Sequence, residues 1–168
     1  MKEPTMYDPI KYWSKRKRPN PYDHVRDIEI EDLKPFIDQA HVILDYGVGT
    51  GRLMPLYRGK IVRGVDIVET YRKECLRNAK DVIFTWSKEI EGGVDLGVCT
   101  KVLLHEPNPK DIIDTLARHC NKVFISTAIN QSAQHVFNHD YMQLLGGYDI
   151  HLWNQHENEL HIVYGNFS

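Results

Sequence analysis

The residues best suited to chemistry form a short glycine-rich segment in the first third of the chain. It reads D-Y-G-V-G-T-G over residues 45–51 and follows directly on an apolar run. Alternating glycines let the backbone turn sharply and let a ligand lie against it without interference from a Cβ atom. The segment is therefore predicted to be a ligand-binding loop between a strand and a short helix.

The acidic residues around this loop help to select the ligand. A dinucleotide-binding loop has the form G-x-G-x-x-G, but counting from Gly47 places Arg52 where the third glycine should be. Asp45, two residues before the first glycine, would repel a pyrophosphate and suits a ligand with positive charge. Asp66 follows the next apolar run, where a carboxylate can accept hydrogen bonds from both ribose hydroxyls of an adenosine. These residues predict a nucleoside without phosphates.

Apolar runs of strand length recur along the chain and must position this loop. Near-continuous apolar residues rich in β-branched types are typical of parallel strands that are covered on both faces. Five such runs are His41–Tyr46, Lys60–Asp66, Asp81–Trp86, Val94–Thr100 and Lys122–Thr127. Two further runs, Gly147–Trp153 and Glu159–Gly165, flank only five residues, too few for a parallel crossover, so they should form an antiparallel hairpin.

Helices are expected between these strands. The predicted ranges are Glu31–Ala40, Glu69–Ala79, Asn108–Cys120 and Gln131–Leu145. Pro35 lies inside the first range and should be tolerated only in the first helical turn. Alternation of strands and helices predicts an α/β sandwich with a mainly parallel sheet.

A basic arm precedes this body. Residues 1–26 carry a net charge of +4, which leaves −6 on the remainder. Asp8 before Pro9 predicts the N-cap of a short helix that extends to about Arg16, and the two prolines of Arg18–Asp23 predict an extended linker. We therefore expect an N-terminal arm or lid over residues 1–26 and one binding domain over residues 27–168. The basic run Lys15–Arg18 is either a phosphate-attracting segment or a solvated one.

The D-x-G-x-G-x-G segment resembles the first motif of the class I S-adenosylmethionine-dependent methyltransferases. The strand series and its terminal hairpin are also similar to that family's Rossmann-like, three-layer fold with a mainly parallel seven-stranded sheet. The resemblance implies S-adenosyl-L-methionine as cofactor. It implies that Gly47, Gly49 and Gly51 line the methionine part and the ribose, that Asp45 lies near the amino group and that Asp66 binds the ribose hydroxyls. Ile67 would pack on the adenine, and Ser87 would lie near the adenine amine.

Residues 94–107 resemble the family's fourth motif, in which an acidic residue opens a strand. The resemblance places Thr100 and Lys101 at the carboxyl end of that strand, beside the cofactor crevice. His105 and Glu106 follow and are candidates for a general base or a substrate contact. The alternative is structural, because His105 could pack against the next helix and Glu106 could favour its N-terminus.

The arm also has a counterpart in the family, since a similar Y-W-x-x-R segment serves as a lid in many small-molecule methyltransferases. Tyr12 and Arg16 would reach the cofactor carboxylate, and Trp13 would either close over the cofactor or anchor the arm to the core. His139, Asp140 and Tyr141 precede the hairpin and could reach the mouth of the site, with Tyr141 better suited to the core.

Composition limits the remaining possibilities. The chain has 168 residues, 42% of them hydrophobic, and no run long enough for a membrane span or a signal peptide, so a single-domain cytoplasmic protein is expected. Three cysteines without a CxxC pair predict buried, reduced thiols. Nine histidines without an HExxH pattern give no reason to expect a metal.

The sequence thus predicts an enzyme that transfers a methyl group to an oxygen or nitrogen of a small molecule. One alternative is an RNA or another phosphate-bearing acceptor guided by the basic arm, although the acidic body does not favour nucleic acid. The other is a non-catalytic module that binds the cofactor, because fold does not settle the reaction.

Overall fold

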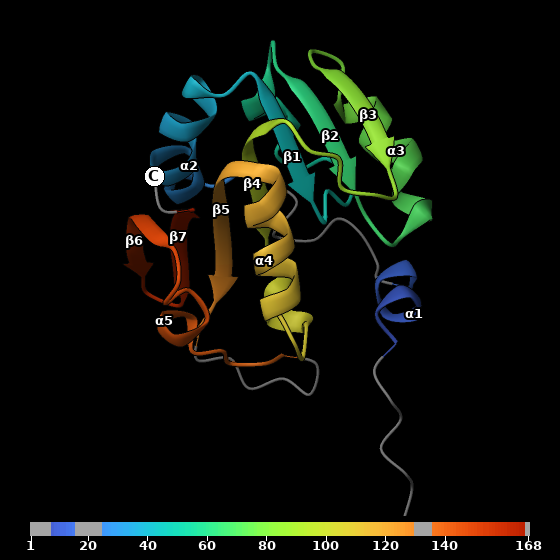
Figure 1. The fold of residues 1–168 in the computed structure, drawn as a ribbon. Coiled ribbons are helices and arrows are strands. Elements are labelled where there is room, and N and C mark those ends of the chain that lie inside the picture. The colour runs from blue at the N-terminus through green and yellow to red at the C-terminus, as the bar shows by residue number, and fades with distance from the viewer. Residues whose placement is uncertain (1–7, 16–24, 130–135, 167–168) are drawn as a thin grey trace, which may run out of the picture.

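The computed structural model describes residues 8–15, 25–129 and 136–166 (Figure 1). A seven-stranded sheet runs through it in the order β3-β2-β1-β4-β5-β7-β6. The strands are β1 (Val42–Tyr46), β2 (Ile61–Val65), β3 (Ile83–Ser87), β4 (Val94–Thr100), β5 (Cys120–Ala128), β6 (Asp149–His156) and β7 (Glu159–Gly165). The first five are parallel, and β7 pairs antiparallel with both β5 and β6. The predicted seven-stranded, mainly parallel sheet with its terminal hairpin is confirmed.

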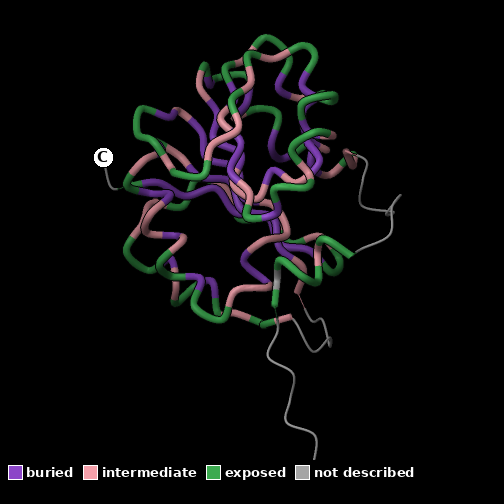
Figure 2. Tube along the Cα trace, turned by 90° about the vertical axis from the view of Figure 1, so that its right-hand side faces the viewer, coloured by how far each residue is buried: buried purple, intermediate pink, exposed green. Residues whose placement is uncertain are grey.

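Helices cover both faces of this sheet. The α-helices are α1 (Pro9–Ser14), α2 (Asp27–Gln39), α3 (Arg72–Asn78), α4 (Lys110–His119) and α5 (Tyr141–Leu144), and the 3-10 helices are η1 (Met54–Tyr57), η2 (Glu69–Tyr71) and η3 (Leu103–His105). One apolar core joins α2, η1 and α3 to the sheet, and a second core joins α4 and α5 to the opposite face. Figure 2 shows the buried segments between exposed outer ones. The predicted three-layer sandwich is therefore correct.

The order of the strands determines where a ligand can bind. β1 lies between β2 and β4, and the chain leaves β1 toward β2 and β3 before it returns to β4 on the other side. Ligands of open α/β sheets bind at such a switch point, beyond the carboxyl ends of the strands. Asp95 marks the opposite end, because its carboxylate accepts hydrogen bonds from the backbone amides of His41 (2.8 Å) and Val42 (2.9 Å) and so joins the amino ends of β4 and β1.

The first long helix begins earlier than predicted. α2 starts at Asp27, four residues before Glu31, because the backbone amide of Arg26 donates to the side chain of Glu29 (3.1 Å) and closes the first turn. Pro35 consequently lies in the interior of α2, and the prediction that it belongs to a first turn was wrong. Packing of Leu33 and Ile37 in the core compensates for the backbone hydrogen bond that proline cannot make.

Two predictions for the C-terminal third also need correction. Residues 136–140 are not helical, and only Tyr141–Leu144 of the predicted helix forms within the described part of the chain; residues 130–135 lie outside it. The backbone amide of Phe137 donates instead to the carbonyl of Leu104 (2.7 Å), which holds this segment beside η3. β6 continues to His156, so the hairpin turn has two residues rather than five.

Other features agree with expectation or lie beyond the described residues. The three cysteines are buried and free, and burial raises the pKa of the Cys75 thiol to about 12. Within the described ranges, no helix is both long and apolar enough to cross a membrane. Arg18–Asp23, the predicted linker, and most of the basic run Lys15–Arg18 fall outside the described residues.

Candidate functional site

A cavity of about 880 Å³ opens at the switch point. Its walls come from the glycine-rich loop, the residues after β2, the end of β4, helix α1 and the turn between β6 and β7. A volume of this size lies within the range of pockets that enclose small molecules and cofactors. The sequence placed the site at this edge of the sheet, and the structure brings most of the predicted residues together there.

The three glycines of the loop have different surroundings. Gly47 has a φ of +77°, and a Cβ atom there would lie 2.2 Å from Val102 Cγ2, so only glycine lets the loop approach the end of β4 this closely. A Cβ at Gly49 would have only the Gly47 carbonyl oxygen within 4 Å, at 3.9 Å, and Gly49 lines the cavity. Gly51 does not line it, because it packs against Met54 and Cys75. Two of the three glycines therefore line the cavity.

Asp66 is held in one orientation beside the loop. Its Oδ2 accepts a hydrogen bond from the Gly49 amide and its Oδ1 from the Val68 amide, both at 2.8 Å. Asp66 also lines the cavity, and a carboxylate oxygen can accept more than one hydrogen bond. Ile67 is 56% exposed and also lines the cavity, as its predicted adenine contact requires. Ser87 does not line it, because its hydroxyl exchanges hydrogen bonds with the backbone of Glu89.

Asp45 is a buried carboxylate at the base of the cavity. It is 2% exposed, and its Oδ2 accepts a hydrogen bond from the Tyr57 hydroxyl at 3.1 Å. Burial raises its pKa to about 7, the Tyr57 hydrogen bond opposes that rise, and the charge of Arg52 opposes it further. A cationic group in the cavity would favour the ionised carboxylate, so the site suits a positively charged ligand.

The end of β4 supplies another wall. Lys101 is the one residue other than glycine with a positive φ (+59°) among the described residues, and its amide donates to the Ser126 carbonyl at 2.7 Å. Its ammonium lies 2.9 Å from Glu159 Oε2, and burial lowers its pKa. Thr100 Oγ1 accepts a long hydrogen bond (3.4 Å) from Arg52. Both predicted residues line the cavity.

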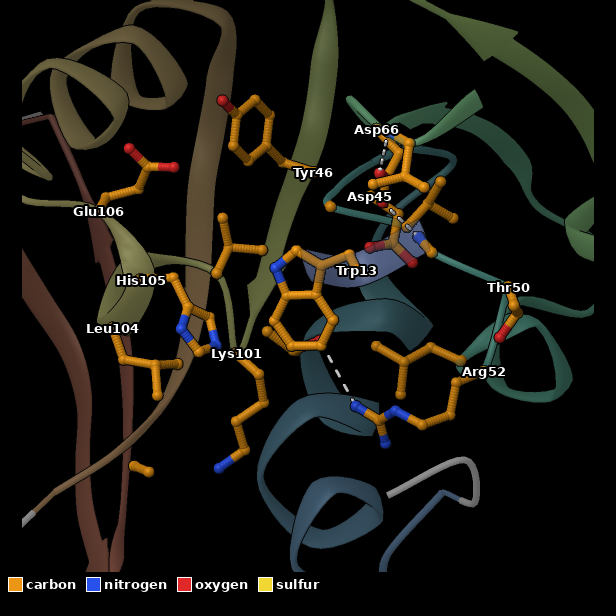
Figure 3. Close-up of a pocket in the computed structure, with 18 of the residues that line it drawn as sticks. Trp13, Asp45, Tyr46, Thr50, Arg52, Asp66, Lys101, Leu104, His105 and Glu106 are labelled. Atoms are coloured by element: carbon orange, nitrogen blue, oxygen red, sulfur yellow. Dashed lines mark hydrogen bonds between the residues drawn. The ribbon is translucent and has the colours of Figure 1, made fainter. Parts of the chain in front are cut away.

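Helix α1 covers the cavity with aromatic side chains. The Asp8 side chain accepts from the Lys11 amide (3.0 Å), so the predicted N-cap is correct. The Trp13 ring meets the His105 ring edge to face at 5.0 Å, and the Tyr71 hydroxyl donates to the Trp13 carbonyl at 2.6 Å. Figure 3 shows the indole in the middle of the pocket. Tyr12 contacts Trp13 and lines the cavity, whereas Arg16 lies outside the described residues.

The base candidates His105 and Glu106 lie at the cavity, whereas the residues predicted to reach its mouth do not. His105 and Glu106 both line the cavity, with His105 turned toward Trp13 and Glu106 farther from it (Figure 3). The residues at 139–141, between β5 and the hairpin, do not line the cavity. A ring nitrogen of His139 lies 3.1 Å from the Leu103 carbonyl, Asp140 caps α5, and the buried Tyr141 donates to Thr127. Tyr141 is therefore a core residue, as its aromatic side chain suggested.

A network of paired charges lies beside the cavity and was not predicted. Glu29 is buried and accepts hydrogen bonds from Arg26 (2.9 Å) and Arg52 (2.7 Å). Burial acts to raise the pKa of Glu29, but the two guanidinium groups outweigh it and hold the pKa at about 2. Arg26 also donates to Glu159 (2.6 Å), which links α2 to β7. These partners lie up to 133 positions apart, so only the local Arg26–Glu29 pair had a signal in the sequence.

Comparison with known proteins identifies the fold. No protein-family model matches the chain, and no curated protein matches it by sequence. A SAM-dependent methyltransferase from Aquifex aeolicus superposes with a TM-score of 0.69 at 14% identity, over 94% of this chain and 98% of that one. An rRNA methylase from Escherichia coli has a TM-score of 0.62 at 20% identity, over 83% of this chain and 64% of that one. Human N-acetylserotonin methyltransferase, solved in complex with SAM, has a TM-score of 0.60 at 14% identity, over 84% of this chain and 52% of that one.

The chain therefore has the fold of the class I S-adenosylmethionine-dependent methyltransferases. The neighbours include proteins named for small-molecule and for ribosomal RNA methylation, so the fold alone does not select an acceptor.

Proposed function

We propose that this chain transfers a methyl group from S-adenosyl-L-methionine to an oxygen or nitrogen of a small molecule. The observation that carries the proposal is the convergence of two carboxylates, Asp45 and Asp66, on a cavity lined by Gly47 and Gly49 at the switch point. Two acidic groups suit a cationic nucleoside and disfavour a pyrophosphate.

The residues present fit this cofactor. The open space beside Gly49 forms a surface against which a ligand can lie, and the fixed carboxylate of Asp66 can accept from ribose hydroxyls. Asp45 would hold the amino group, and Ile67 would pack on the adenine. When bound, the cofactor supplies an electrophilic methyl group on a sulfonium.

The chain's own contribution to the reaction is positioning, exclusion of water and removal of a proton. Trp13 would exclude water, because its ring lies in the cavity and its backbone is fastened to Tyr71. His105, which contacts Trp13, is the proposed proton acceptor for the attacking atom. Glu106 lies farther from Trp13 and is assigned a substrate contact.

Two observations favour a small acceptor. The α1 aromatics line a cavity of about 880 Å³, a volume within the range of small-molecule pockets. The nearby cations Arg26, Arg52 and Lys101 are all paired with Glu29 or Glu159, so most of their positive charge is compensated and less of it is available to attract phosphate groups.

The test is transfer of a labelled methyl group from S-adenosylmethionine to two fractions of a cell extract, one of small metabolites and one of RNA. Label in the small-molecule fraction, reduced about 100-fold or more by His105→Ala, is the expected result. Label in RNA with strong salt dependence would replace the proposed acceptor with nucleic acid. Cofactor binding without any label would instead support the non-catalytic module. Asp66→Ala, which we expect to bind the cofactor weakly, is the negative control.

A further inference from the structure

Two histidines and an aspartate, none of them among the residues proposed to hold the cofactor, converge beside the cavity, and one of the three, His156, also lines it. Asp32 Oδ2 lies 2.5 Å from His156 Nε2 and 2.7 Å from His161 Nδ1. One potential ligand atom from each residue lies within 4.8 Å of the others. Asp32 and His161 are buried, and the side chain of His156 is 26% exposed.

The fold supplies this grouping from two separate elements. In the β6–β7 hairpin, His161 pairs with Asn154 and His156 pairs with Glu159. Side chains two positions apart share one face of a strand, so all four point to the same face. Asp32 of α2 lies against this face, and Asn154 donates to its Oδ1 at 2.8 Å.

The cluster has the outer support that metal-binding histidines need. Nε2 of His161 lies 2.8 Å from Glu159 Oε1. A carboxylate in this position fixes the ring and directs the lone pair of the other nitrogen, Nδ1, toward Asp32. Glu159 is itself held by Arg26, Lys101 and Ser126. Each contact of a histidine nitrogen with Asp32 needs a positive centre between the two atoms, either a proton or a metal ion.

We propose that Asp32, His156 and His161 bind one divalent transition-metal ion of the zinc class. Two imidazole nitrogens and one carboxylate oxygen are a ligand set that zinc and its neighbours accept and that Mg²⁺ or Ca²⁺ does not prefer. Tetrahedral ligands about 2.05 Å from zinc lie roughly 3.3 Å apart, so binding requires the nitrogens to withdraw from Asp32 by less than about 1 Å. The ion would join α2 to the terminal hairpin.

The site would retain an open coordination position. Three protein ligands leave one tetrahedral position for water or substrate. His156 also lines the cavity described above, as do its neighbours Glu157 and Asn158. The sequence expectation of no metal rested on the absence of CxxC and HExxH-like spacing, whereas this proposal rests on the alternating residues N-x-H and E-x-H at 154–156 and 159–161.

The test is titration of the full chain, stripped of metal by a chelator, with Co²⁺ followed by visible absorption and with Zn²⁺ followed by calorimetry. The expected result is one equivalent bound, with the intense d–d absorption of a four-coordinate ion. His156→Gln should weaken binding at least about 100-fold, and Glu159→Gln about 10- to 100-fold. His151→Ala, which removes an exposed histidine of the same strand, should leave binding unchanged.

Each outcome decides the proposal without reference to cofactor binding. Absence of a saturable equivalent, or only the weak spectrum of six-coordinate Co²⁺, would overturn it. Binding by His156→Gln as tight as that of the wild type would also overturn it. If a variant fails to fold by circular dichroism, the wild-type stoichiometry and spectrum still give the answer.

Discussion

Replacement of Asp45 by asparagine should stabilise the protein and weaken its cofactor binding. The carboxylate is buried at the base of the cavity, with a hydrogen bond from Tyr57, and burial raises its pKa to about 7. Asparagine has nearly the same shape and keeps an oxygen that can accept from Tyr57. It removes the cost of ionising a buried acid.

The magnitude follows from the difference between the folded pKa of about 7 and the ordinary value of 3.8. Because the folded pKa lies above the unfolded value, ionisation of Asp45 costs no stability below pH 3.8, and the cost grows as the pH rises toward 7. The shift of about three units corresponds to about 4 kcal/mol at pH 8 and about 2 kcal/mol at pH 5. The free energy of unfolding of Asp45→Asn should therefore exceed that of the wild type by these amounts, with the larger gain at the higher pH.

The assay is urea unfolding of both proteins at pH 5 and pH 8, with Asp38→Asn as a control for loss of an exposed carboxylate. The control should change the free energy of unfolding by less than about 0.5 kcal/mol. An equal stability of wild type and Asp45→Asn at both pH values would refute the reasoning. The same variant should bind S-adenosylhomocysteine at least about tenfold more weakly at pH 8, because the counter-charge for its amino group is lost.

Three further predictions concern the loop, the cover and the charge network. Gly47→Ala should lower the free energy of unfolding in urea by roughly 3 kcal/mol, because of the Val102 contact and the positive φ. Gly49→Ala should lower it by only about 1–2 kcal/mol and still weaken S-adenosylhomocysteine binding. Equal losses of stability in the two variants would contradict the loop geometry. Trp13→Ala should weaken that ligand about tenfold by calorimetry with an unchanged unfolding midpoint, and a large drop in the midpoint would make Trp13 a core anchor. Glu159→Gln should cost about 3–5 kcal/mol at pH 7. Hydrogen bonds from His161 and Arg26 outweigh burial and lower the pKa of Glu159, so its contribution to the free energy of unfolding is present above pH 4.5 and is lost as the pH falls. The difference in stability between wild type and Glu159→Gln should therefore narrow in urea unfolding at acid pH.

The sheet could be predicted because each strand has a local signal. Apolar runs of strand length identified all seven strands within a few residues, and the short connection before Glu159 required an antiparallel pair. Helix limits were less predictable. The start of α2 depends on the local contact of the Arg26 amide with Glu29, which the apolar spacing used to predict the helix does not include. The backbone of Phe137 is bonded to Leu104, a contact distant in sequence, and residues 136–140 are not helical.

The site shows the same division between local and distant information. Asp45, Gly47, Gly49 and Asp66 could be placed from one loop and one neighbouring strand end, and they line one cavity. Gly51 belongs to the same motif but packs against a helix, which its spacing could not reveal. The charge network and the histidine cluster could not be predicted from the sequence, because each joins the α2 region to the terminal hairpin, more than 100 positions away.

The central claim is that the glycine loop and its two carboxylates bind a cationic nucleoside rather than a dinucleotide. Calorimetric titration of the purified chain with S-adenosylhomocysteine, with NADH as the matched control, tests this claim without knowledge of the acceptor. The account predicts micromolar binding of S-adenosylhomocysteine and none of NADH. Binding of NADH, or of neither compound, would contradict it.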